Sequence, residues 1–518
     1  MKARHEYPRS SGVLLPVTML PGPYGIGVLG AEATEFIDLL HEAGFHAWQV
    51  LPVEHTGEGF APYNCVSAFA GEPMLIDPRM LMDMGLVSSE ELDVRADGTS
   101  ADTVHYELVC EKQWDLLRAA FSRLEGKPYI KYKPFWLDNY ALYMALKHHF
   151  GDIPWYEWPD EGLRSHDTAA LKKASKEFED EINFYKFVQW VFDDQWKSVK
   201  AYAAGRDVSI IGDMPFYVSK DSAEVWSRRE LFDCDPEGIV PTVSGAPPDY
   251  FTPLGQHWGN PIYNWKLMKQ NGYVWWTNRV RASIERYDIV RLDHFRGFES
   301  YWSIPSEAPD ASYGEWVKGP GKLLFATMER ELGKLPVIAE DLGDIGDSVE
   351  KLLQATKIRG MRILQFGFLG DERHMLHNIT EDNIAYTGTH DNTTLLAWMF
   401  ELWQEDRDKA LFYLGFNGEW WNGGPNCAIN QAWIRAVFMT AASIAIVPIQ
   451  DMLGYGADTR TNTPGTTEGN WCFRVRREAL DHIDKGFYRW LNIVFGRDNA
   501  PKESADASED EETGGTGT

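Results

Sequence analysis

The sequence has few cysteines and no long apolar run. Among its 518 residues there is no CxxC pair, and no stretch approaches the roughly 18 uninterrupted apolar residues that a membrane helix needs. An odd number of scattered cysteines favours neither a disulfide framework nor a zinc or redox site, and it fits a reducing compartment. The basic start, MKARHEYPRSSG, has no apolar stretch after it. We therefore predict an unprocessed cytoplasmic protein. The five cysteines are Cys65, Cys110, Cys234, Cys427 and Cys472.

Positive charge is also scarce. The chain has 50 Lys and Arg against 77 Asp and Glu, a net charge of -27, and no basic stripe opposes this average. Such a charge repels phosphates and anionic lipid, so nucleic acid and membrane surfaces are unfavourable partners. Neither HExxH nor an EF-hand loop occurs, so we expect no metal and no cofactor. Residues 499–518 are acidic, lack aromatics and are predicted to form a disordered tail.

What is present is ample core material, with 44% apolar residues, arranged as alternating strand-like and helix-like segments. Short aliphatic runs, each followed by a stretch of helical period, are typical of parallel βα units. Eight of them predict an α/β protein with a (β/α)8 barrel, whose site lies at the carboxyl ends of the strands. The eight predicted strand segments are 11–20, 45–55, 208–218, 287–295, 335–343, 361–368, 383–391 and 442–452.

Unequal spacing between these segments predicts three insertions into one catalytic barrel that spans residues 1–498. The largest, at about 56–180, contains two stretches of helical period, 104–124 and 135–150, and is expected to be a helical subdomain. A second, at about 219–285, is rich in Pro, Gly, Trp and Tyr, and a third covers about 392–440. No fixed-period repeat appears, which argues against a solenoid or propeller.

Four acidic residues stand at the ends of predicted strands, which converge in a closed barrel: Asp213, Asp293, Glu340 and Asp391. Retaining cleavage of a glycosidic bond needs two carboxyl groups about 5 to 5.5 Å apart. Arg291 shares a strand face with Asp293 and would favour the ionised carboxylate of a nucleophile. Glu340 follows an apolar run, and burial would favour the neutral form of a general acid. Any one of these residues could equally be an ion pair or a loop cap; the set of four favours catalysis.

A competing motif is GIGVLG at 25–30, which fits GxGxxG, follows a strand and has Glu54 near the end of the next strand. This is the fingerprint of a nicotinamide dinucleotide site. However, PGPY separates the strand from the glycines, and the motif leaves the strand-end carboxylates unexplained. We give the oxidoreductase reading little weight.

The motifs LPGPYGIGVLG, APYNCVSAFAGEP, GAPPDYFTPLGQHWGNP, VRLDHFRGFESYW, VIAEDLG, YTGTHDN and NTPGTTEGNW occur in this order between about residues 11 and 476. Together they resemble the 4-α-glucanotransferases known as amylomaltases or disproportionating enzymes, relatives of the α-amylases. The resemblance implies Asp293 as nucleophile, Glu340 as acid/base and Asp391 as transition-state stabiliser. It further implies that the substrate-binding residues are Tyr63, Asp213, Asp249, Tyr250, Trp258, Gly259, Asn260, Arg291, His294, His390, Asn462, Pro464 and Trp471.

The reaction implied is retaining transfer of an α-1,4-glucan segment to the 4-hydroxyl of glucose or another glucan, with maltooligosaccharides and other α-1,4-glucans as partners. An α-amylase-like hydrolase would use the same catalytic residues, because only the attacking hydroxyl differs, so the choice of transfer rests on the resemblance. A non-catalytic glucan-binding protein is the third reading, which the presence of all three carboxylates makes the weakest.

Overall fold

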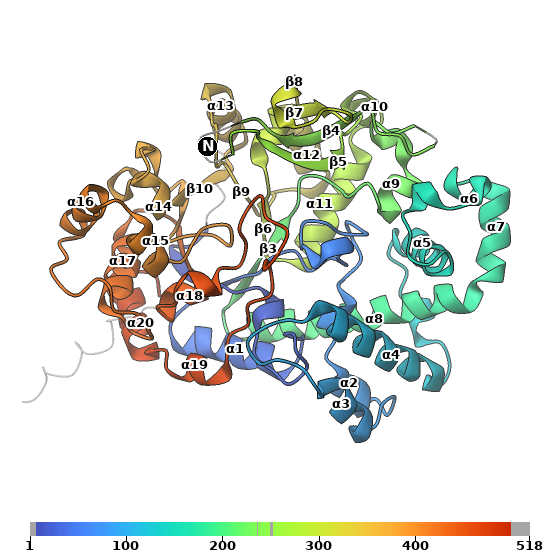
Figure 1. The fold of residues 1–518 in the computed structure, drawn as a ribbon, viewed down its shortest axis with the longest axis horizontal. Coiled ribbons are helices and arrows are strands. Elements are labelled where there is room, and N and C mark those ends of the chain that lie inside the picture. Colours follow the sequence, from blue (N-terminus) through green and yellow to red (C-terminus); the bar gives the residue numbers. More distant parts are fainter. Residues whose placement is uncertain (1–6, 236, 249–251, 499–518) are drawn as a thin grey trace, which may run out of the picture.

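The structure, a computed structural model, describes residues 7–235, 237–248 and 252–498 (Figure 1). Eight parallel strands close into a barrel in the order β1-β12-β11-β10-β9-β6-β3-β2. This confirms the predicted (β/α)8 barrel, and each predicted strand segment overlaps one barrel strand. Their bounds are β1 Ser10–Leu14, β2 Ala47–Gln49, β3 Ser209–Met214, β6 Ile289–Leu292, β9 Val337–Ala339, β10 Arg359–Ile363, β11 Asn383–Tyr386 and β12 Ile444–Pro448.

Side chains that alternate along the strands fill the barrel and cover its outside. In β12, Ile444 and Ile446 join an interior cluster with Ile211 of β3 and Ile384 of β11. Their neighbour Ala445 belongs to the larger core between the barrel and its helices. Because successive residues of a strand face opposite sides, a strand that is apolar throughout serves both cores. The barrel interior is therefore a packed core, and a ligand site has to lie at its end.

Close packing leaves some strand positions without room for a side chain. A Cβ atom at Gly212 in β3 would lie 2.1 Å from the ring of Tyr287. A Cβ atom at Gly12 in β1 would lie 2.6 Å from the Cβ of Ala47 in β2. Glycine at these positions lets the neighbouring side chain and strand approach closely.

Helices surround the barrel and form a lobe on one side, at the right of Figure 1. The predicted helical stretches 104–124 and 135–150 are confirmed as α4 and α5, and α8 runs from this lobe back to β3 and α1. The bounds are α1 Ala31–Glu42, α2 Pro78–Asp83, α3 Ser89–Ala96, α4 Tyr106–Arg123, α5 Leu137–His149, α6 Glu161–Arg164, α7 Thr168–Glu177, α8 Glu179–Ala204, α9 Ala223–Ser227 and α10 Trp265–Gln270. The later helices are α11 Val274–Arg286, α12 Lys322–Leu332, α13 Asp347–Thr356, α14 Leu364–Gly367, α15 Leu395–Glu401, α16 Gln404–Leu414, α17 Ala428–Met439, α18 Ile449–Met452, α19 Arg477–Asp481 and α20 Lys485–Val494.

A second, antiparallel sheet in the order β5-β4-β7-β8 lies at the top of Figure 1. Its strands are β4 Thr242–Ala246, β5 Gln256–Pro261, β7 Ser300–Pro305 and β8 Glu315–Lys318. The sequence indicated a Pro- and Gly-rich insertion where β4 and β5 lie, and it predicted no strand at β7 or β8. The sheet carries Trp258, in β5, toward the carboxyl ends of the barrel strands.

All eight predicted strand segments extend past the carboxyl end of the observed strand, and two of them show the reason. The segment 11–20 stops being a strand at Leu14, because Pro16 leads into a short 3-10 turn at Val17–Met19. The segment 383–391 leaves the strand after Tyr386, and the Asn392 Oδ1 accepts hydrogen bonds from the Thr389 N–H and hydroxyl, both at 2.9 Å. That turn carries His390 and Asp391 out of the strand and into the site.

Within the described ranges, no helix is long and apolar enough to cross a membrane. The predicted tail, 499–518, lies outside the described residues.

Candidate active site

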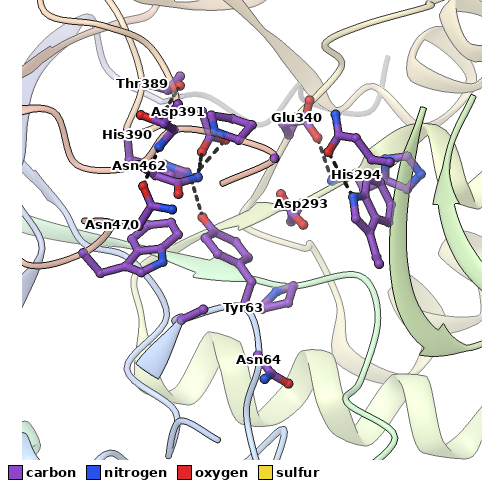
Figure 2. A pocket seen from close by; sticks show the side chains of 18 of the residues that line it. Tyr63, Asn64, Asp293, His294, Glu340, Thr389, His390, Asp391, Asn462 and Asn470 are labelled. Atoms are coloured by element: carbon purple, nitrogen blue, oxygen red, sulfur yellow. Dashed lines mark hydrogen bonds and ion pairs between the residues drawn. The ribbon is translucent and has the colours of Figure 1, made fainter. Parts of the chain in front are cut away.

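A cleft of about 3220 Å³ opens at the carboxyl ends of the barrel strands. Figure 2 shows part of it, with Asp293 and Glu340 on one side and Asp391 on the other. Asp213 lies behind the cleft and is fully buried. Asp249 and Tyr250 lie outside the described residues. The predicted site residues that line the cleft are Tyr63, Trp258, Gly259, Asn260, Arg291, Asp293, His294, Glu340, His390, Asp391, Asn462, Pro464 and Trp471.

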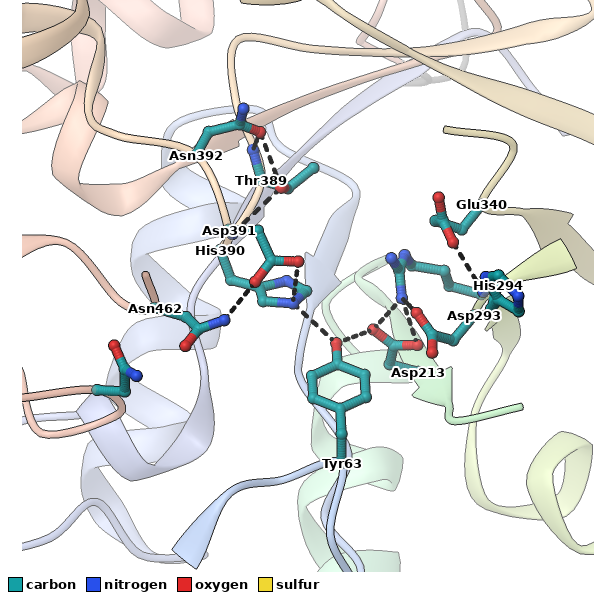
Figure 3. A network of polar contacts seen from close by, with 12 residues as sticks. Tyr63, Asp213, Asp293, His294, Glu340, Thr389, His390, Asp391, Asn392 and Asn462 are labelled. Carbon is teal, nitrogen blue, oxygen red and sulfur yellow. Dashed lines mark hydrogen bonds and ion pairs between the residues drawn. The ribbon is translucent and has the colours of Figure 1, made fainter. Parts of the chain in front are cut away.

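Asp293 follows directly on β6 and is held beside Arg291 of the same strand. The Arg291 Nη1 donates to the Asp293 Oδ1 at 3.0 Å and to both oxygens of Asp213 at 2.8 and 2.7 Å. Parallel pairing of β3 with β6 places Asp213 opposite Arg291, which explains the contact (Figure 3). Arg291 is only 4% exposed, whereas the Asp293 side chain is 26% exposed to the cleft. The guanidinium thus fixes one side of Asp293 and leaves the other open to a ligand.

Glu340 follows β9 and faces Asp293 from the neighbouring strand. Its Oε2 accepts from the backbone N–H of His294 at 2.7 Å, and its Oε1 accepts from that of Leu342 at 2.9 Å. His294 adopts a left-handed conformation with φ 45°, which turns its N–H toward Glu340. The residue that follows Asp293 therefore holds the Glu340 carboxyl group in place.

Two groups of this site have shifted pKa values. Burial, reinforced by the charge of Asp293, raises the pKa of Glu340 to about 8, although Arg291 and the two N–H donors oppose the shift. Burial lowers the pKa of His294 to about 4, and its Nε2 is buried without a partner among the described residues. At neutral pH Glu340 keeps its proton, as a general acid needs, and His294 is a neutral ring with an unused nitrogen.

Asp391 stands on the opposite wall, in the turn after β11. The Asn462 Nδ2 donates to its Oδ1 at 2.6 Å, and the His390 Nε2 lies 3.3 Å from its Oδ2. The Arg460 Nη2 donates to its backbone oxygen at 2.5 Å. The side chain is 43% exposed, so the carboxylate is oriented by the protein while remaining accessible from the cleft.

Tyr63 joins the two walls. Its hydroxyl donates to the Asp213 Oδ2 at 2.7 Å and lies 3.0 Å from the His390 Nε2 (Figure 3). Its ring stacks on that of His390, with centroids 5.3 Å apart and planes 19° apart. Trp471 packs at an angle against both rings, at 6.1 and 5.9 Å. Tyr63 therefore lies at the floor of the site, between the Asp293 and Asp391 sides.

We expect Tyr63→Phe to lower kcat/KM on glucan substrates by roughly ten- to a hundredfold, because a hydrogen bond to a charged group is lost. The control is Tyr202→Phe, which removes a comparable phenol-to-carboxylate bond, 2.8 Å to Asp38, away from the cleft. Steady-state kinetics of both variants checks this. An equal loss of kcat/KM in both variants, or no loss in Tyr63→Phe, would show that the Tyr63 hydroxyl has no specific role in the site.

An aromatic wall faces the carboxylates from the second sheet. Trp258 is 37% exposed and its ring meets His294 edge-on, with centroids 5.0 Å apart. Gly259 beside it has φ 78°, a conformation suited to glycine, and no atom lies within 4 Å of where its Cβ would be. The flat amphipathic Trp258 ring and the open backbone beside it form a surface suited to a sugar ring.

Three of the cleft residues that sequence reasoning missed lie close to the predicted ones. Arg460 binds the backbone oxygens of Asp391 and Asn462, Tyr217 lines the cleft below Trp258, and Gln365 donates to the Thr393 oxygen at 2.8 Å. Tyr217 and Gln365 lie in the last part of the predicted segments 208–218 and 361–368, just beyond the observed strands β3 and β10, and that position was a usable signal. Nothing in the local sequence marks Arg460 as a neighbour of Asp391, which lies 69 residues away in the chain.

The glycines of GIGVLG pack against the chain itself. A Cβ atom at Gly27 would lie 1.8 Å from the Val17 carbonyl oxygen, and one at Gly30 would lie 1.6 Å from the Asp77 Oδ2. Glu54, the residue expected to bind a ribose, pairs with Arg286 at 2.7 Å. The small residues serve close packing, and the dinucleotide reading is wrong. In the described ranges, no group of three or more His, Cys, Asp or Glu side chains is placed to hold a metal.

Comparison with known proteins agrees with this geometry. A family model described as 4-alpha-glucanotransferase, of glycoside hydrolase family 77, matches residues 15–480. The chain belongs to this family. A 4-alpha-glucanotransferase of Aquifex aeolicus is 41% identical over 497 residues, covering 95% of this chain and 100% of the relative. A 4-alpha-glucanotransferase of Thermus thermophilus is 41% identical over 484 residues, covering 91% of this chain and 95% of the relative.

A solved structure is similar over nearly the whole fold. Amylomaltase from Streptococcus agalactiae in complex with acarbose has a TM-score of 0.90 and 37% identity, and the match covers 94% of this chain and 99% of that one. The resemblance drawn from the sequence motifs is thereby confirmed at the level of the 4-alpha-glucanotransferase family and its barrel.

Proposed function

We propose that the chain transfers segments of α-1,4-glucans to the 4-hydroxyl of glucose or another glucan, by two successive displacements with retention of configuration. One observation carries the proposal. Asp293 and Glu340 follow two paired strands, β6 and β9, and the backbone N–H next to Asp293 donates to Glu340; the pKa of Glu340, raised to about 8, makes it an acid at neutral pH. Two carboxyl groups with different protonation states are what this chemistry needs.

In the first step the Asp293 carboxylate attacks the anomeric carbon of the donor sugar. The bond from that carbon to the glycosidic oxygen breaks, and Glu340 gives its proton to the departing oxygen. In the second step the acceptor 4-hydroxyl gives its proton to Glu340 and bonds to the anomeric carbon, which releases Asp293. Asp391, oriented by Asn462 and His390, binds hydroxyls of the same sugar and favours its cationic transition state.

The surrounding groups hold the sugar whose bond breaks. Arg291 and Asp213 fix Asp293, and the neutral His294 lines the cleft beside it. Trp258, Gly259 and Asn260 form the facing wall, and Asn462, Pro464 and Trp471 form another. Asp249 and Tyr250 belong to the same proposal on the family resemblance alone.

Transfer prevails over hydrolysis when an acceptor glucan occupies the cleft ahead of water. The size of the cleft and its aromatic lining support binding of a second glucan. We propose that maltooligosaccharides and longer α-1,4-glucans are both donors and acceptors. We also propose a cytoplasmic location, since the five cysteines are free thiols and a reducing compartment suits them.

The test is incubation of the purified protein with maltotriose alone, following free glucose, longer oligosaccharides and total reducing ends. We expect glucose and a ladder of longer chains, with the total number of reducing ends nearly constant. Rising reducing ends without a ladder would make the protein a hydrolase. An unchanged substrate would favour a binding protein without catalysis.

A further inference from the structure

The cleft extends well beyond the catalytic carboxylates, along a helix that the proposed mechanism does not use. Trp403, Asp406, Lys409 and Tyr413 line the same cleft as Asp293, Glu340 and Asp391. These four residues, which we term the α16 platform, lie on α16 or directly before it. Figure 1 shows α16 at the left edge of the molecule, outside α14 and α15.

The α16 platform combines one face of a helix with the residue before it. Asp406, Lys409 and Tyr413 are spaced by three and four residues, which brings their side chains onto the same side of α16, and Trp403 is the N-cap of this helix. Ten residues at a rise of 1.5 Å separate Trp403 from Tyr413, so the platform is about 15 Å long. It is therefore long enough to contact several consecutive sugar units rather than a single ring.

Trp403 is unusual among the tryptophans of the described ranges. It is 83% exposed, the highest value for any of them, and within these ranges its indole makes no ring contact and no hydrogen bond. A large amphipathic ring held in solvent at the rim of a cleft has no role in the core. A flat apolar face with one N–H donor at its edge suits a sugar, which presents C–H groups on one face and hydroxyls around its rim.

The rest of the platform is held in place and is polar. The backbone N–H of His377 donates to the Tyr413 hydroxyl at 3.2 Å, and the His377 ring lies 2.9 Å from the same oxygen. Lys409 and Asp406 pair at 3.1 Å and are both exposed. Charged groups beside aromatic rings give hydrogen-bonding partners for hydroxyls, and they make a purely apolar occupant unfavourable.

A continuous set of contacts connects the platform to the catalytic wall. Thr393, two residues after Asp391, donates its hydroxyl to the Glu401 carboxylate at 3.2 Å, and Glu401 lies two residues before Trp403. On the other side the ring of Phe368, which also lines the cleft, packs against Tyr413 at 5.6 Å. These contacts link the catalytic wall to the platform, so a glucan that extends along this wall meets the platform.

We propose that the α16 platform is a distal subsite for α-1,4-glucan, with Trp403 stacking on a sugar unit several residues from the bond that is cut. This inference rests on the proposed function, because it assumes an α-glucan in the cleft. It assigns to the platform a preference for long chains over short ones, since only a glucan that extends from the carboxylates to α16 would contact Trp403.

The test compares Trp403→Ala with the parent on maltotriose and on short-chain amylose. We expect the ratio of kcat/KM on amylose to kcat/KM on maltotriose to fall by about tenfold, or about 1.4 kcal/mol. Trp403→Phe, which keeps a flat ring, should recover most of that ratio.

Two controls distinguish this effect from the effect of removing any exposed aromatic ring. Trp490→Ala removes another exposed tryptophan, 66% exposed on α20 and outside the cleft. Phe412→Ala removes the 89% exposed ring next to Tyr413 on α16, also outside the cleft. Both controls should keep the parent ratio. A parent-like ratio in Trp403→Ala, or an equal loss of kcat/KM on both substrates, would overturn the proposal. A change of oligomeric state in both Trp403→Ala and Phe412→Ala would also overturn it.

Direct binding distinguishes failure of the subsite from failure of the proposed function. Calorimetry of amylose binding to Asp293→Asn and to Asp293→Asn/Trp403→Ala needs no turnover. About tenfold weaker binding in the double variant supports the subsite even if the parent fails to act on maltotriose. Equal affinities overturn the subsite even if the parent disproportionates maltotriose.

Discussion

Asp293→Asn is expected to lower kcat for glucan transfer by at least about 10⁴-fold while the protein stays folded. An amide has no charge with which to attack the anomeric carbon, so the covalent step is lost. The fold should survive, since the Asn oxygen can still accept from Arg291 and the side chain is partly exposed. Transfer assays on maltotriose, together with thermal unfolding of both proteins, measure the two effects.

The matched control is Asp288→Asn, which lies just before β6, at the end opposite Asp293. Asp288 accepts from the backbone N–H of Ile210 at 2.8 Å and pairs with Lys200 at 3.3 Å, so its role is structural. We expect this variant to lose stability and to keep kcat per folded molecule. Transfer by Asp293→Asn at more than about a hundredth of the parent rate would remove Asp293 as the nucleophile.

Glu340→Gln is expected to lower kcat on maltotriose by about 10²- to 10⁴-fold, because the departing oxygen no longer receives a proton. The loss in the first displacement should be much smaller on maltotriosyl fluoride, whose leaving group needs no proton. The rate of the first step is measured as the burst of fluoride from maltotriosyl fluoride and as the initial release of glucose from maltotriose. If Glu340→Gln lowers both rates by the same factor, Glu340 does not act as the acid.

The raised pKa of Glu340 also predicts a pH dependence. The acid form is the active one, so activity should persist through neutral pH and fall as the pH rises through about 8. Glu340→Gln should lack this alkaline decline in its residual activity. Glu224→Gln is the control, because burial also raises the pKa of Glu224, to about 7. Glu224 lies outside the cleft, where it accepts hydrogen bonds from the Ser67 hydroxyl and the Ala68 N–H. Its profile should match the parent's.

The barrel was predictable from the sequence because its strands are nearly continuous aliphatic runs, buried on both faces. Residues 208–218 and 442–452 carry such runs, and each contains a barrel strand. Strand ends were less predictable. The 383–391 segment keeps its apolar character only to Tyr386, and the side chains of Thr389 and Asn392 then form a turn. The second sheet was missed because β5 is polar and because β4 pairs with β7, which lies beyond barrel strand β6 in the sequence.

The site was predictable in part. Strand-end carboxylates converge in any closed barrel, so grouping Asp213, Asp293 and Glu340 required only the barrel. The contacts of Tyr63 with Asp213 and His390, which are 150 and 327 residues away, required the fold itself. The same is true of Arg460 beneath Asp391, and of Trp403, whose exposure only the packed chain reveals. Local sequence indicates which residues can do chemistry, and tertiary packing decides which of them meet.

The most direct test of the central claim is to trap the covalent intermediate on Asp293. Glu340→Gln, incubated with maltotriosyl fluoride, should accumulate a glycosyl-enzyme, because fluoride leaves without an acid and no base then activates the acceptor. Proteolysis and tandem mass spectrometry should find the maltotriosyl group on the peptide that contains Asp293, attached at that carboxylate. A glycosyl group on another residue, or turnover of the fluoride with inverted configuration and no adduct, would contradict the double-displacement account.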